Sequence, residues 1–156
     1  MAKKYTADKL LAALRPFAKA RNDALAAGFT DNGGAIHSVE RIVEILCRAV
    51  CFPEVSHPSN LRKSPRVEIS KAAHIEREKG NWDDLWLEHV MPQRAYARDL
   101  CECIETMTDE DVIAHIKATY RVCIITRAEQ KHIDKINRSR MTPDRIAEAG
   151  IELHSL

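Results

Sequence analysis

The chain has 156 residues, of which 45% are hydrophobic and 30% are charged, and its formal net charge at pH 7 is +1. This balance excludes a wholly disordered chain, because enough apolar side chains are present to offset the entropy lost on folding. No apolar run approaches the roughly 20 residues of a membrane-spanning helix, and no apolar segment follows the N-terminal lysines. We therefore expect a cytoplasmic protein with no membrane partner.

The N-terminal third predicts a pair of packed helices. Residues 6–20 repeat apolar side chains at helical spacing, and residues 38–51 do so again after Ser38, a candidate N-cap. The run Asp31-Asn32-Gly33-Gly34 favours a turn between them. We expect residues 1–56 to form a helical N-terminal part, whose apolar faces serve either the core or a homo-oligomer.

The middle of the chain alternates loops with short elements. Residues 52–66 predict a loop without regular structure, because three prolines lie within it (Pro53, Pro58 and Pro65). Ser70 is a candidate cap for a short helix, residues 85–90 could form a strand, and Pro92 is well placed to begin the next helix.

The last third carries the clearest local signals. Thr108 resembles the start of a capping box for a helix over 109–119, and residues 121–126 form a β-branched apolar run typical of a buried strand. Thr126 with Glu129 predicts a second capping box and a helix to about Asn137, and a short helix is expected over 142–150. The predicted class is α+β, mostly helical with a small two- or three-stranded sheet, in one compact domain.

The cysteines indicate reduced thiols and no structural zinc. Their number is odd and no two are spaced as C-x-x-C, the usual spacing of zinc ligands (Cys47, Cys51, Cys101, Cys103 and Cys123). Cys47, Cys51 and Cys123 lie in apolar runs, where cysteine acts as a small hydrophobic residue, so we expect these thiols to be buried and inert.

Glu88 and His89 are the residue pair best suited to chemistry. A carboxylate can hold a hard divalent cation while a neighbouring imidazole takes a proton from water. Adjacent residues of a strand point to opposite faces, but at a strand end both can reach one pocket. The helix after the next strand offers further ligands, of which Glu129 and His132 are three positions apart and share a face.

Glu88-His89-Val90-Met91-Pro92-Gln93 resembles the E-H-[IV]-[MV]-P motif of divergent HNH (ββα-metal) nucleases, and residues 122–130 are similar to the second strand and first helical turn of the same finger. The resemblance spans residues 82–92 and 120–143. It implies a ββα-metal-like part over 57–156 and a metal-dependent endonuclease that hydrolyses DNA. His89 would then be the general base and Glu88 a ligand of Mg²⁺ or another divalent cation.

The same resemblance leaves the helix ligand open among Glu129, Gln130 and His132. Basic residues near this helix are candidates for phosphate contacts, and a loop pair forms a second set (Lys131, Lys135, Arg138 and Arg140; Arg62 and Lys63). Trp82 and Trp86 could stack on bases if exposed, but core packing is the favoured interpretation. The alternative function is a non-catalytic, mostly helical regulator that binds nucleic acid or protein.

Overall fold

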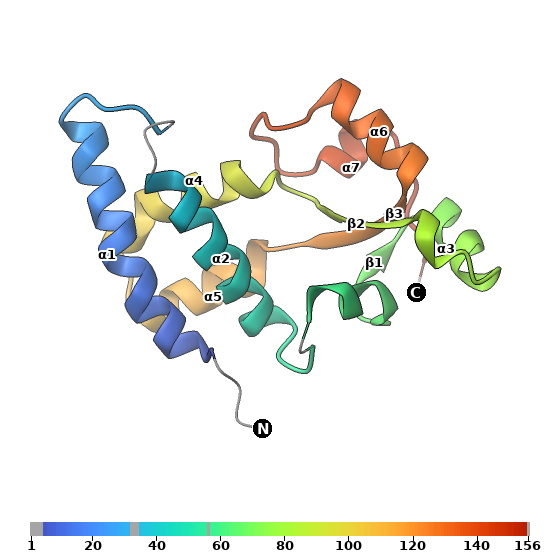
Figure 1. The fold of residues 1–156 in the computed structure, drawn as a ribbon, viewed down its shortest axis with the longest axis horizontal. Coiled ribbons are helices and arrows are strands. Elements are labelled where there is room, and N and C mark those ends of the chain that lie inside the picture. Colours follow the sequence, from blue (N-terminus) through green and yellow to red (C-terminus); the bar gives the residue numbers. More distant parts are fainter. Residues whose placement is uncertain (1–4, 32–34, 56, 156) are drawn as a thin grey trace. The chain divides into compact units, whose positions relative to one another are not determined.

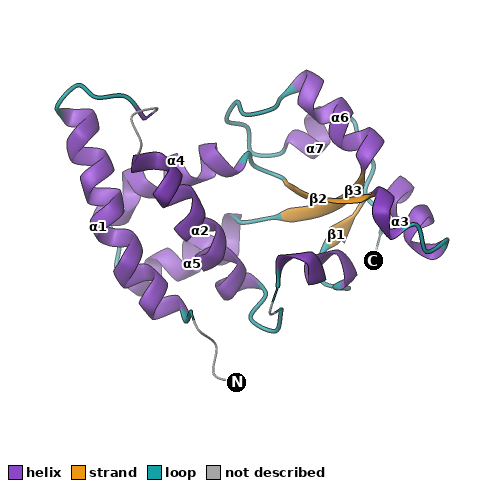
Figure 2. Cartoon of the chain, viewed as in Figure 1, coloured by secondary structure: helices purple, strands orange, loops and turns teal. Residues whose placement is uncertain are grey.

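The structure is a computed structural model that describes residues 5–31, 35–55 and 57–155 (Figure 1). The fold is α+β and mostly helical, with a three-stranded mixed sheet (Figure 2). The chain divides into two compact units, Met1–Glu54 with Gln93–Tyr120 and Val55–Pro92 with Arg121–Leu156, which we call unit 1 and unit 2. The predicted boundary instead lies between residues 56 and 57. The two divisions differ because residues 93–120 present apolar faces that pack with the N-terminal helices.

Unit 1 consists of helices that bury one apolar face each. They are α1 (Ala7–Ala26), α2 (Ala35–Cys51), α4 (Gln93–Cys103) and α5 (Asp109–Thr119). The predicted helix over 6–20 continues through Pro16 to Ala26, where Gly28 follows with φ of +90°. A glycine just beyond the last turn takes this left-handed conformation without strain, which ends the helix there. The predicted turn residues 32–34 lie outside the described residues.

Ser38 lies inside α2 and does not cap it, because the helix begins at Ala35. Thr108 does cap α5: its hydroxyl accepts from the backbone of Asp111, whose side chain accepts in return from the Thr108 backbone. This reciprocal pair satisfies two backbone donors of the first turn. The predicted capping box at Thr108 is therefore confirmed.

Unit 2 is built around the sheet, whose strand order is β1-β3-β2. Its strands are β1 (Glu68–Ile69), β2 (Leu85–His89) and β3 (Val122–Thr126), and its helices are α3 (Lys71–Glu78), α6 (Arg127–Ile136) and α7 (Arg145–Glu148). β3 pairs parallel with β1 and antiparallel with β2. β2 is therefore an edge strand, which pairs with another strand on one side only among the described residues.

Two local predictions in unit 2 were wrong. The segment 52–66 is not entirely irregular, because Pro58 begins a short 3-10 helix, Pro58–Lys63, called η2. Proline is tolerated in the first turn of a helix, since its missing N–H has no partner there. The last helix is also shorter than predicted, because the Asp144 side chain accepts from the backbone of Ala147 and starts α7 at Arg145.

The core of unit 2 lies between the sheet and the last two helices, which Figure 1 shows on one side of it. It comprises Val90, Cys123, Ile125, Ile133, Ile146 and Ala149. All residues of β3 are buried, as the β-branched run predicted. Thr126 accepts from the Glu129 backbone and Glu129 accepts in return, so the predicted second capping box is confirmed.

No helix in the described part of the chain is long and apolar enough to span a bilayer.

Candidate nucleic-acid interface

Glu88 lies on the face of the sheet that α6 and α7 cover. Its strand partner is Cys123, a member of the core on that face, and only 7% of Glu88 is exposed. The carboxylate forms an ion pair with Arg145 of α7 and accepts from the backbone N–H of His89. Burial raises the pKa of Glu88 above its ordinary value, and the Arg145 charge opposes this rise. The Glu88 carboxylate therefore has a structural partner.

His89 points away from Glu88. The register pairs Glu88 with Cys123 and His89 with Val122, and side chains of successive strand residues emerge on opposite faces. β2 remains regular to its last residue, so no bulge turns the two side chains toward one pocket. The predicted base and the predicted ligand therefore lie on different faces of the sheet.

The other predicted ligands are also separated. Glu129 accepts from the Thr126 backbone at 2.8 Å and from the Ser70 hydroxyl at 2.7 Å, so its carboxylate joins the starts of two helices. His132 is exposed on α6. Across residues 5–31, 35–55 and 57–155, no three His, Cys, Asp or Glu side chains gather in a way that could hold a metal ion. As placed, these residues do not fit one shared cation, and the Mg²⁺ site stays a prediction.

Both tryptophans lie at the surface of unit 2, so the expectation of core packing was wrong. Trp82 is 41% exposed and Trp86 39% exposed. The Lys63 ammonium lies 5.8 Å from the ring centre of Trp82, and the Arg127 guanidinium 5.2 Å from that of Trp86. Trp82 lies in a short 3-10 helix just before β2, and Trp86 lies on β2, the edge strand.

A groove of about 270 Å³ adjoins Trp86. Its lining comes from η2, from β2 and from the first residue of α6 (Pro58, Ser59, Arg62, Leu85, Trp86, Leu87 and Arg127). Arg62 donates to the carbonyl of Leu85 at 3.1 Å, and Arg127 donates to the carbonyl of Asp83 at 2.9 Å. These hydrogen bonds hold two guanidinium groups at the rim of the groove.

The predicted phosphate contacts continue from this groove along α6. Arg127, Lys131 and Lys135 recur every four residues, so they share one side of the helix, and all three are exposed. Arg138 and Arg140 follow α6, where Arg140 forms an ion pair with Glu148. Sequence reasoning missed Arg127, although its spacing of four from Lys131 could have identified it.

The thiols take no part in this surface. Cys47, Cys101 and Cys123 are buried, whereas Cys51 and Cys103 are half-buried, which corrects the expected burial of Cys51. Burial raises the pKa of Cys123 to about 12, so the thiol stays protonated and unreactive at neutral pH. None of these five cysteines, all of which lie in the described part of the chain, forms a disulfide.

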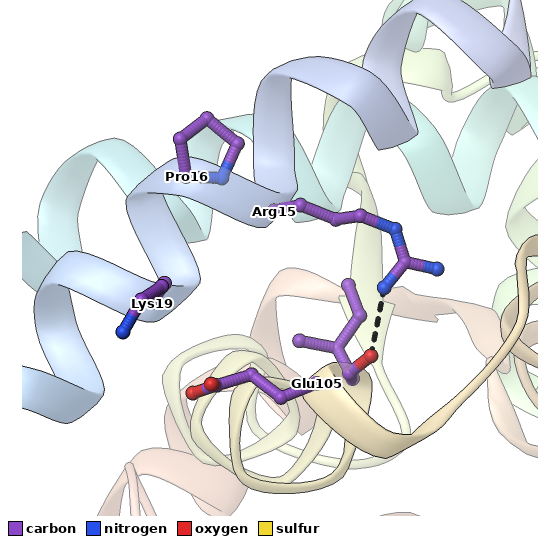
Figure 3. A pocket seen from close by; sticks show the side chains of 5 residues that line it. Arg15, Pro16, Lys19 and Glu105 are labelled. Carbon is purple, nitrogen blue, oxygen red and sulfur yellow. Dashed lines mark hydrogen bonds between the residues drawn. The ribbon is translucent and has the colours of Figure 1, made fainter.

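A second hollow, of about 310 Å³, lies in unit 1. Figure 3 shows Arg15, Pro16 and Lys19 of α1 lining it opposite Glu105. Arg15 donates to the Ile104 carbonyl at 2.8 Å and pairs with Asp109, and Lys19 pairs with Asp23. Because both cations are paired with carboxylates, we assign no ligand to this hollow.

The comparisons with known proteins identify no relative. The chain matches no protein-family model, no curated protein and no solved structure. Its function must therefore be argued from its own residues.

Proposed function

We propose that this protein binds DNA through the surface of unit 2 that carries Trp82, Trp86 and the neighbouring basic residues. The observation that supports this most is the pair of exposed tryptophans, each with a cation over its ring, beside a groove rimmed by Arg62 and Arg127. Aromatic rings and cations together are the means by which proteins hold flexible strands without reading their sequence.

Each residue type supplies a different part of the binding energy. Stacking of a base on an aromatic side chain contributes about 1–3 kcal/mol. Cations near the phosphates release counterions from the nucleic acid, which makes the affinity dependent on salt. Because the formal net charge of the whole chain is only +1, the attraction comes from this local cluster.

The neighbouring acidic residues favour one path for the strand. Asp83 and Asp84 lie between Trp82 and β2, and their charges oppose a phosphate beside them. The side of α6 with Arg127, Lys131 and Lys135 carries three cations at a regular spacing. We therefore place the phosphates along α6.

The test is binding of fluorescein-labelled DNA of about 12 nucleotides, followed by polarisation, a length within the range of known single-strand sites. For the wild type, the logarithm of the affinity should fall with the logarithm of the salt concentration with a slope of about 2–3, as expected for contacts to three or four phosphates. The combined change Arg127→Gln and Lys131→Gln should weaken binding about tenfold or more. Lys79→Gln, which removes an exposed charge at the end of α3, is the control and should change the affinity less than about twofold. Absence of binding, or equal losses in both variants, would overturn the proposal.

Hydrolysis of DNA is a second candidate. β2 and β3 pair antiparallel although α4 and α5 separate them in the chain, α6 follows β3 directly, and β2 ends at His89, as the HNH resemblance implies. Nicking of plasmid DNA in the presence of Mg²⁺, and its loss in His89→Ala, is the result that would support it. Nicking that persists in this variant would point away from His89.

A further inference from the structure

We infer that the groove beside Trp86 holds one unpaired base of a DNA strand. This inference rests on the proposed DNA binding and adds the form of DNA that is bound. Three features of the groove support it: a stacking surface, a pair of backbone hydrogen-bonding groups, and cations at the rim.

The backbone groups belong to Leu87, at the open edge of β2. The Leu85 carbonyl points away from β3, because it accepts from Arg62 of η2. Backbone groups of an antiparallel strand alternate between its two sides, so those of Leu87 point the same way as those of Leu85. The hydrogen bond made by its strand partner Ile124 supports this orientation. The Ile124 carbonyl accepts from the backbone N–H of Ser70 on the β1 side and not from Leu87. One N–H and one C=O therefore face the groove.

The backbone carbonyls at both ends of this edge already accept hydrogen bonds. The Leu85 carbonyl accepts from Arg62, and the His89 carbonyl accepts from Arg145 at 2.8 Å. An added β-strand needs a longer row of open backbone groups, and charged side chains on an edge discourage it. The edge of a single base, which can present a donor and an acceptor side by side, matches the remaining backbone groups of Leu87.

The size and chemistry of the groove also favour a base. Its volume of about 270 Å³ lies below the roughly 300–1,000 Å³ of pockets that enclose larger ligands. Arg127 lies over the Trp86 ring, and 39% of the residue is exposed. A base within a duplex is already stacked and paired, so only an unpaired base can enter.

The lining favours DNA over RNA. A ribose 2′-hydroxyl is usually recognised by a hydrogen-bonding partner. No carboxylate or amide side chain of the described residues lines the groove. The Ser59 hydroxyl lies 2.7 Å from His57 Nδ1, which also accepts from the Ser59 backbone N–H, so the hydroxyl proton is directed to that ring and not to an incoming ribose.

The experiment uses single strands that differ only in their bases. A labelled strand of about 12 thymidines is compared with an abasic strand of the same length, an abasic strand with one thymine, a hairpin duplex and oligouridine. We expect the single thymine to raise the affinity at least about fivefold over the abasic strand in the wild type and not at all in Trp86→Ala. Ile75→Ala, which truncates another exposed side chain of unit 2, is the matched control and should behave as wild type.

A second readout follows Trp86 directly. The chain contains two tryptophans, so Trp82→Phe leaves Trp86 as the sole indole emitter. Thymidine strands should quench its fluorescence, and the duplex should not.

The outcomes separate this inference from the proposed function. Equal binding of the abasic and thymidine strands, with no effect of Trp86→Ala, would overturn the base site and leave phosphate binding intact. Equal or tighter binding of oligouridine would overturn the assignment to DNA. If none of the strands or the duplex binds, the proposed function and the base site both fall.

Discussion

Glu88 and Arg145 form the most buried ion pair in unit 2 among the described residues, with side chains 9% and 7% exposed. Arg145 also donates to the carbonyls of His89 and Arg138, so one guanidinium joins the end of β2, the chain after α6 and the start of α7. A buried charge without a partner is strongly unfavourable, which makes such a pair sensitive to the loss of either member.

The ionisation of Glu88 opposes folding, because burial raises its pKa above the ordinary value of 4.5. The stability that Glu88 contributes is therefore fully present when the pH is below the pKa of Glu88 in the unfolded chain. It is lost as the pH rises through the higher pKa of Glu88 in the folded protein. Arg145 limits that loss, since its charge favours the ionised carboxylate.

We predict that Arg145→Met lowers the free energy of unfolding by about 3–5 kcal/mol near pH 8, where the Glu88 carboxylate is left buried and unpaired. Near pH 4 the loss should be smaller, because Glu88 is then protonated. Urea unfolding at the two pH values measures both effects. Adding Glu88→Gln should recover part of the stability near pH 8, and no recovery would contradict this account. Arg138→Met is the control for loss of an exposed arginine.

At the scale of elements, Ser70, Thr126 and Glu129 connect two helix starts. The Ser70 hydroxyl accepts from Ala73 to cap α3 and donates to Glu129, which belongs to the capping box of α6. Both helices therefore begin at fixed positions beside the sheet, and Arg127 is fixed at the groove because it is the first residue of α6.

We predict that Thr126→Ala lowers the free energy of unfolding by about 1 kcal/mol, the usual effect of removing a helix cap. The hydroxyl that accepts from the Glu129 backbone is lost, and the first turn of α6 loosens. Chemical denaturation followed by circular dichroism measures the change. Ser139→Ala removes an exposed hydroxyl and should leave the stability unchanged, so a similar loss in that variant would argue against the capping account.

At the scale of the whole molecule, the chain leaves unit 2 and returns to it at adjacent points. His89 pairs with Val122, and the backbone N–H of Val90 donates to the carbonyl of Arg121. Residues 93–120, which belong to unit 1, therefore interrupt a hairpin of unit 2. Unit 2 also has an apolar core of its own, between the sheet and α6 and α7.

We predict that unit 2 folds and binds DNA by itself when the interruption is removed. The variant consists of residues 55–156 with an Asn-Gly pair in place of residues 91–120. This pair would join Val90 to Arg121 by a two-residue turn of the kind that connects antiparallel strands. Circular dichroism should show a cooperative unfolding transition, and the DNA affinity should lie within about twofold of that of the full chain. A variant that is unfolded, or folded without affinity for DNA, would contradict this prediction.

The sequence by itself determined most of the elements and their starts. The caps at Thr108, Thr126 and Ser70, the buried strand over Val122–Thr126 and the mostly helical α+β class all follow from signals within a few residues. Such signals act locally, because a cap needs only a side-chain oxygen near the first turn and a strand pattern needs only its own neighbours.

Only the tertiary structure decided which side chains meet. The pairing of Glu88 with Arg145 joins residues 57 positions apart, the surface position of Trp86 depends on β2 being an edge strand, and Arg127 reaches that ring only because β3 pairs with β2. The HNH-like motif illustrates the difference, since its spacing is compatible with Glu88 and His89 in one pocket but the strand register places them on opposite faces. Contacts between distant segments depend on how whole elements pack, and no short stretch of sequence carries that information.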